Sequence, residues 1–192
     1  MKVEHHVRIH DNPPVRMSIL AETPARAREM ALAWYEAQDP DAQLTLSQVE
    51  AIVPPVDQLI RVVYASPGDP AEVVMLCRDQ LSLERLFQGE IQEHYVPGGL
   101  MVLTGKSFEQ PFHGPPDRIL RITQCLCFHL NDPLIICSCR NDQYSSVPAA
   151  LEDFLVGLLD EAYMQADIVC NSLEKGGDTH GLMPAQTSTQ DT

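Results

Sequence analysis

The chain has 192 residues, of which 44% are hydrophobic and 21% are charged. These proportions exclude a wholly disordered polymer and predict one ordinary domain or two small ones. No apolar run approaches the roughly 18 residues of a membrane-spanning helix. The first six residues lack the apolar core of an export signal. We therefore expect a cytoplasmic protein with no membrane partner.

The charge is strongly acidic, with 27 acidic against 13 basic residues and a net charge of −14. It is also uneven, because residues 141–192 hold nine acidic residues and one basic residue. Such a surface repels phosphate backbones, so we expect no direct binding of nucleic acid. The charge favours instead a protein partner, including one whose nucleic-acid site a negative surface can occupy.

The first 55 residues predict a small ββαβ module. Residues 3–10 alternate, with Val3, Val7 and Ile9 on a core face and Glu4 and the histidines 6 and 10 on a solvent face. A turn at 11–14 leads to a second strand at 15–20. A helix then begins at Thr23-Pro24 and runs to residue 38, with an apolar stripe of Ala27, Met30, Ala31 and Trp34. Residues 44–53 predict the last strand.

Residues 56–177 predict a second α+β unit. Strands are expected at 58–65 and 71–77, a short helix at 81–88, a hairpin at 90–96 and 100–104, and a loop at 106–117. A last hairpin is expected to pair 118–130 with 134–140. The three-four apolar spacing then predicts a long C-terminal helix over 147–175, capped by Ser146 and ended by Gly176-Gly177. Residues 178–192 have the composition of a disordered tail.

Two segments resemble proteins of mobile genetic elements. Residues 21–31, Ala-Glu-Thr-Pro-Ala-Arg-Ala-Arg-Glu-Met-Ala, follow two predicted strands as in small ββαβ modules of phages, plasmids and conjugative elements. Residues 83–91, Leu-Glu-Arg-Leu-Phe-Gln-Gly-Glu-Ile, with 99–102, Gly-Leu-Met-Val, are similar to a mobile-element domain of unknown function. The resemblance implies an accessory protein of a phage or plasmid and carries no catalytic residues.

Four cysteines form the most suggestive cluster for chemistry. Residues two apart in a strand share a face, so the predicted hairpin would bring together Cys125, Cys127, Cys137 and Cys139. One interpretation is a zinc or redox site. The other is that these thiols are small core residues, because one flat face offers ligands from a single side and the spacing is not C-x2-C. We favour the core interpretation and expect no cofactor, with zinc as the alternative.

Catalytic patterns are missing from the sequence, which has no phosphate-binding glycine loop, no G-x-S-x-G and no H-E-x-x-H. A Cys–His pair of Cys127 with His94 or His113 stays open, because such partners meet in space. His6 and His10 share a strand face but lie about 13 Å apart, too far for one metal ion. We interpret His5, His6 and His10 as solvent-facing.

The long C-terminal helix carries acidic residues at heptad spacing. Asp153, Asp160 and Asp167 are predicted to lie opposite the apolar stripe, beside Glu152 and Glu161. They are either a solvated outer face or an anionic surface that docks onto a basic groove of a partner. The apolar stripe of the same helix is an alternative contact, with a second copy of the chain.

Together these patterns predict an α+β protein with a ββαβ module, a central mostly antiparallel sheet with a short helix, and a long C-terminal helix. The predicted function is binding rather than catalysis, with a host or element-encoded protein as partner and antagonism of a host defence or nucleic-acid enzyme as the concrete version. The alternatives are a metal- or redox-active protein and a structural homo-oligomer.

Overall fold

The N-terminal part of the chain folds largely as its pattern predicts. The structure, a computed structural model, describes residues 1–41, 43–87, 89–96, 98–105, 118–121, 127–130 and 133–175, with the backbone alone for 118–121, 127–130 and 163–175. Strands β1 (Val3–Ile9) and β2 (Val15–Ala21) pair antiparallel, with Val3 opposite Ala21. Helix α1 (Pro24–Gln38) follows, and its first turn is capped by Thr23, whose Oγ1 accepts from the Arg26 N–H at 3.2 Å.

The strand predicted over 44–53 is shorter than expected. Its first half forms a 3-10 turn, η1 (Leu46–Gln48), and only β3 (Val49–Ile52) pairs with β1. The Thr45 N–H donates to Gln48 Oε1 at 3.0 Å, and the Gln48 N–H donates to the Thr45 carbonyl at 2.9 Å. These local hydrogen bonds compete with a strand ladder and delay the start of β3.

The following segment adds six strands to β1, β2 and β3 and completes a nine-stranded sheet in the described part of the chain. After the turn η2 (Val56–Gln58), its elements are β4 (Leu59–Ala65), β5 (Glu72–Cys77), α2 (Gln80–Phe87), β6 (Ile91–Val96), β7 (Leu100–Gly105), β10 (Leu134–Arg140) and β11 (Gln143–Ser145). The strand order is β2-β1-β5-β4-β10-β7-β6, with β3 beside β1 and β11 beside β10. All pairs are antiparallel except β1 with β5. The predicted α+β class and mostly antiparallel sheet are confirmed.

The last predicted hairpin is wrong. Strand β9 (Cys127–Leu130) pairs with β8 (Arg118–Arg121) in a separate two-stranded sheet, whereas β10 lies between β4 and β7. Leu134 and Ile136 of β10 pack on one face, and Ile135 and Cys137 pack on the other. A strand that is apolar on both faces belongs in the middle of a covered sheet, which is why β10 does not stay with its neighbour in sequence.

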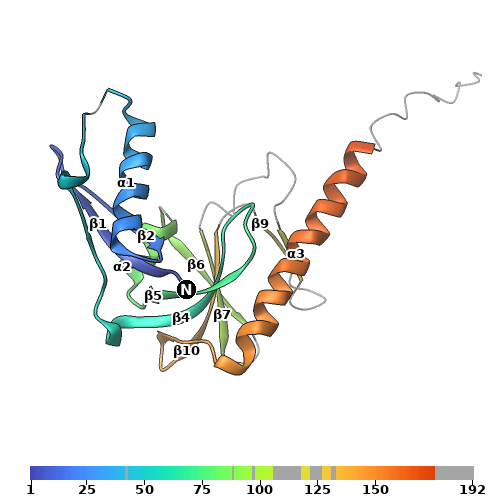
Figure 1. Ribbon diagram of the computed structural model, residues 1–192. Coiled ribbons are helices and arrows are strands. Elements are labelled where there is room, and N and C mark those ends of the chain that lie inside the picture. The colour runs from blue at the N-terminus through green and yellow to red at the C-terminus, as the bar shows by residue number, and fades with distance from the viewer. Residues whose placement is uncertain are drawn as a thin grey trace, which may run out of the picture.

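Helices cover the sheet from both faces. The long helix α3 (Ala149–Lys175) packs Leu155 and Leu159 against one face, over a cluster that includes Val63 and Val102. The short helix α2 covers the other face with Leu83. Helix α1 covers β1 and β2 through Ala27 and Ala31, and Figure 1 shows α1 and α3 at opposite ends of the molecule. None of the helices in the described ranges is long and apolar enough to cross a membrane.

The joint between β1 and β5 is narrow and is completed by side chains. The two strands pair at a single position, where the Met75 N–H donates to the Lys2 carbonyl at 3.1 Å. One step further the Glu4 carboxyl replaces the backbone acceptor, because its Oε2 accepts from the Cys77 N–H at 2.7 Å. Glu4 is only 1% exposed, so its predicted place on the solvent face is wrong.

His5 is also buried, in contrast to the prediction that the three histidines of this strand face solvent. Its Nδ1–H donates to the Val3 carbonyl at 2.9 Å, which satisfies one ring nitrogen inside the fold. His6 and His10 keep about a third to a half of their side chains exposed, at 37% and 48%. The histidine prediction therefore fails for His5 alone.

Candidate functional site

The acidic residues predicted on α3 do not share one face. Glu152 is buried and pairs with Arg61, whose Nη2 lies 2.5 Å from Glu152 Oε2. Asp160 Oδ1 accepts from the Ala71 N–H at 2.8 Å. Both residues therefore face the sheet, and their predicted place on the outer face is wrong. The two remaining described members, Asp153 and Glu161, are exposed, and the Asp167 side chain lies outside the described side chains.

The reason lies in the pattern of the helix. Leu155, Leu159 and Ala162 are buried, and Glu152 precedes this stripe by three residues, so it lies on the same face. Leu151 and Phe154 also follow helical spacing but are exposed. The sequence contains two overlapping apolar stripes and does not show which one packs inward. Ser146 differs from its predicted capping role, because its Oγ accepts from the Arg61 N–H at 3.0 Å.

The four cysteines are not brought together by the predicted hairpin. In β10, Cys137 lies opposite Met101 and Cys139 lies opposite Tyr144. Cys125 lies outside the described residues, and of Cys127 only the backbone is described. Among the side chains that are described, no group of three or more His, Cys, Asp or Glu could hold a metal ion. A zinc site at these thiols stays an untested prediction.

Burial makes Cys137 a core thiol, which gives a first testable expectation. Burial, with Cys139 and Glu93 nearby, raises the pKa of Cys137 to about 12. The thiolate is the reactive form, so alkylation of native Cys137 at pH 8 should be more than about a hundredfold slower than that of a free thiol. Peptide mass spectrometry after iodoacetamide treatment measures this, with the urea-unfolded chain as the control. Equal modification in both states would contradict the burial of this thiol.

A serine, a histidine and a carboxyl group meet where β1 contacts α2. Ser82 Oγ and His6 Nε2 share a hydrogen bond of 3.0 Å, and Glu4 Oε1 lies 3.4 Å from the same nitrogen. A nucleophilic triad needs the carboxylate on the other ring nitrogen and a serine open to substrate. Ser82 is 1% exposed, so this cluster holds α2 against β1 and is not a catalytic site.

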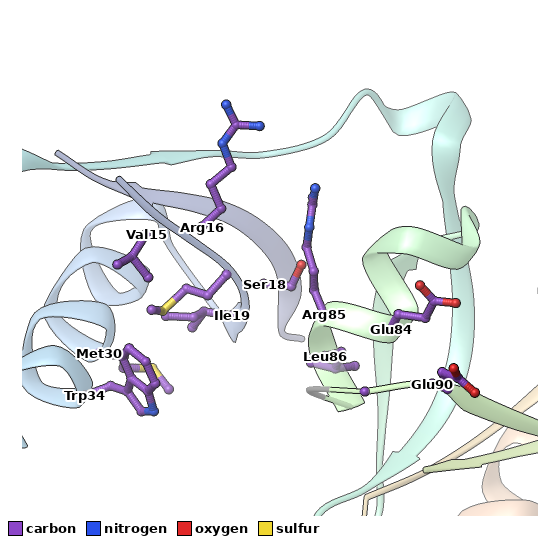
Figure 2. Close-up of a pocket in the computed structure, with 12 residues that line it drawn as sticks. Val15, Arg16, Ser18, Ile19, Met30, Trp34, Glu84, Arg85, Leu86 and Glu90 are labelled. Carbon is purple, nitrogen blue, oxygen red and sulfur yellow. The ribbon is translucent and has the colours of Figure 1, made fainter. Parts of the chain in front are cut away.

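A second candidate site in the described structure is a groove along β2. This β2 groove has a volume of about 700 Å³ and runs between α1 and α2 (Figure 2). Its lining comes from three elements and the segment after α2: Val15, Arg16, Met17, Ser18 and Ile19 of β2, Met30 and Trp34 of α1, Glu84, Arg85 and Leu86 of α2, and Gly89 and Glu90. It is in the size range of sites that bind small ligands or peptide side chains.

The groove follows an open strand edge. Strand β2 ends the strand order of the sheet and, within the described residues, pairs only with β1. The other edge of β2 therefore carries backbone N–H and C=O groups that no described strand pairs, and five residues of this strand line the groove. Alternate residues of β2 face opposite helices: Met17 and Ile19 pack in the cluster under α1, whereas Leu20, two positions from Ser18, packs in the cluster under α2.

The wall on the α1 side is apolar and open to solvent. Met30 and Trp34 are 40% and 42% exposed, although the sequence placed them in the inward stripe of this helix. Ala27 and Ala31 of that stripe are buried as predicted. Ala27 and Ala31 pack in the cluster with β1 and β2, whereas the larger Met30 and Trp34 line the groove. The stripe prediction identified the residues but not the surface that they form.

The side of the groove nearer α2 carries charge. Arg16 and Arg85 extend in the same direction in Figure 2, away from Trp34 and Met30. Neither guanidinium has an ion-pair or hydrogen-bond partner among the described residues, whereas Glu84 accepts from Gln80 Nε2 at 2.8 Å and Glu90 also has a partner. The groove therefore combines an apolar wall, an open strand edge and two arginines that have no partner among the described residues.

Comparisons with models of protein families, with curated proteins and with solved structures found no match to this chain. The functional argument consequently depends on the geometry of the groove itself.

Proposed function

We propose that this chain is a non-enzymatic protein-binding protein that takes up an extended segment of a partner protein along the free edge of β2. The observation that supports the proposal is the coincidence of an open strand edge with an apolar groove. Extended segments bind such edges by adding a strand, with affinity from main-chain hydrogen bonds and specificity from alternate side-chain pockets. Five consecutive residues of β2 line the groove, which corresponds to about 17 Å of added strand.

The origin of the protein and the identity of its partner form a narrower part of the proposal. In that version the chain is an accessory protein of a phage or plasmid, and its partner is a host defence or nucleic-acid enzyme. The net charge of −14 supports this version. An acidic protein is repelled by nucleic acid but is attracted to the basic surfaces of proteins that bind nucleic acid. Exposed Asp153 and Glu161 on α3 are a second proposed contact with that partner.

Trp34 is the only tryptophan of the chain and lies in the groove wall, so its fluorescence reports occupancy directly. The probe is an acetylated and amidated nonapeptide, Gly-Ser-Val-Thr-Val-Thr-Val-Ser-Gly. We expect a saturable blue shift of Trp34 emission and less quenching by acrylamide. The variant Met30→Glu should weaken binding by about tenfold or more, because it places a charge in the apolar wall. Phe154→Glu, at an exposed position of α3, is the matched control and should bind normally.

Two modified peptides test whether the peptide binds as a strand. One is N-methylated at the three valines and the other at the two threonines and the second serine. Successive residues of a strand direct their N–H groups to opposite edges, so only one set can donate to β2. We expect one modified peptide to lose binding and the other to keep it. Equal binding of both, or no Trp34 response to the unmodified peptide, would refute the proposed function.

A further inference from the structure

The two sides of the β2 groove differ in chemistry, and a strand added to β2 would contact both. Side chains of a strand alternate between faces, so every second residue of a bound segment meets the α1 side and the others meet the α2 side. The α1 side offers Met17, Ile19 and Trp34. The α2 side offers Arg16, Ser18 and Arg85. A segment that satisfies both sides must itself alternate in polarity.

The positive charge on the α2 side is reinforced by a neighbouring strand. Arg8 of β1 is exposed and lies directly opposite Arg16 in the β1–β2 register, with Glu50 of β3 on its other side. Like charges directly opposite each other in a strand pair are unfavourable. A carboxylate placed beside Arg16 would relieve this repulsion. Arg8 and Arg16 thus place positive charge beside the open edge of β2, although the chain as a whole has a net charge of −14. This local charge favours acidic ligands over basic ones.

Carboxylates of the protein itself limit where an acidic ligand fits. Glu84 and Glu90 also line the groove on this side, and both have partners within the chain. Figure 2 shows both near α2 and its end, whereas Arg16 lies on β2. An acidic ligand side chain is therefore favoured beside Arg16 and Arg85 and disfavoured beside Glu90.

We propose that the bound segment is a strand of a partner protein in which apolar residues alternate with acidic ones, the apolar set facing α1 and at least one carboxylate facing Arg16 and Arg85. This specificity rests on the proposed function of the groove. A second copy of the chain is the less suitable occupant, because its β2, Val-Arg-Met-Ser-Ile-Leu-Ala, carries no acidic residue and each copy carries the same net charge.

Three nonapeptides that differ only between the valines test this specificity. The two positions between the valines are both threonine, both glutamate or both lysine. Trp34 fluorescence again reports binding. We expect affinity to fall in the order glutamate, threonine, lysine, with about a tenfold difference between the first and last at low salt that shrinks as salt is added. In the double variant Arg16→Glu/Arg85→Glu the order should reverse. That variant is expected to stay folded, because Arg8 then lies opposite a carboxylate.

The matched control is Arg28→Glu/Arg140→Glu, which changes the net charge equally at two exposed arginines outside the groove. It should keep the original order of the three peptides. Equal affinity of all three peptides, or the same reversal in the control, would overturn the acidic preference while leaving strand addition intact. Failure of all three to bind would refute the proposed function instead. A Trp34 signal that changes with protein concentration alone would identify a second copy as the occupant and overturn the preference.

Discussion

Glu4→Ala is expected to lower the free energy of unfolding by about 3 kcal/mol, because it leaves the buried Cys77 N–H without an acceptor and removes a buried side chain. The effect is large because β1 and β5 pair at only one position, so the Glu4 carboxyl supplies a main part of the joint. Urea denaturation followed by circular dichroism measures it. Glu4→Gln should cost less than Glu4→Ala, since its amide oxygen can still accept from Cys77.

Lys2→Ala is the matched control at the same joint. Lys2 Nζ lies 2.6 Å from Glu72 Oε1, but these side chains are 44% and 35% exposed. An exposed ion pair contributes about 0–1 kcal/mol, so this variant should be close to the parent protein. If Lys2→Ala were as destabilising as Glu4→Ala, the joint would depend on its exposed charges and not on the buried carboxyl group.

Local signals predicted the elements of the fold well. Thr23-Pro24 sets the start of α1 by capping and backbone preference, and the three-four spacing identified α3 to within two residues at its start. Strand partners depend instead on contacts far apart in sequence. Adjacent segments were expected to form a hairpin, but β10 finds a fully covered position between β4 and β7. The apolar run at 134–137 was the available sign of this placement.

The groove could not be predicted from the sequence. Trp34 was placed in the apolar stripe of its helix, but nothing local shows that α1 and α2 flank the same edge of β2. The edge itself follows from the order of nine strands, which places β2 at one end. Glu4 illustrates the same limit, because a charged residue in an alternating pattern indicates a solvent face unless a distant N–H meets it.

The acidic surface proposed on α3 failed in part for a related reason. Glu152 and Asp160 are charged, so the pattern assigned them to the outside, yet Arg61 and the Ala71 N–H meet them from the sheet. Buried or half-buried carboxylates are tolerated where such partners exist. The helix thus uses two acidic residues to fix its position on the sheet and leaves others, including Asp153, for solvent or a partner.

Leu159→Ala is expected to cost about 3 kcal/mol of stability, within the range of about 2–5 kcal/mol for buried leucines. Leu159 is completely buried and lies in the cluster through which α3 covers the sheet. Phe154→Ala, at a residue that is 65% exposed on the same helix, should stay within about 0.5 kcal/mol of the parent. Urea denaturation at two protein concentrations measures both variants.

The comparison separates the two interpretations of α3. If its buried stripe covers the sheet of its own chain, the loss in Leu159→Ala is independent of protein concentration. If that stripe instead joined two copies, the urea midpoint of the parent protein would rise with protein concentration. The midpoint of Leu159→Ala would then be lower and would depend less on protein concentration. Because α3 lies at the opposite end of the molecule from α1, which supplies one wall of the β2 groove, folded Leu159→Ala should bind the valine peptide with unchanged affinity (Figure 1). Stability and binding would then depend on different parts of one sheet.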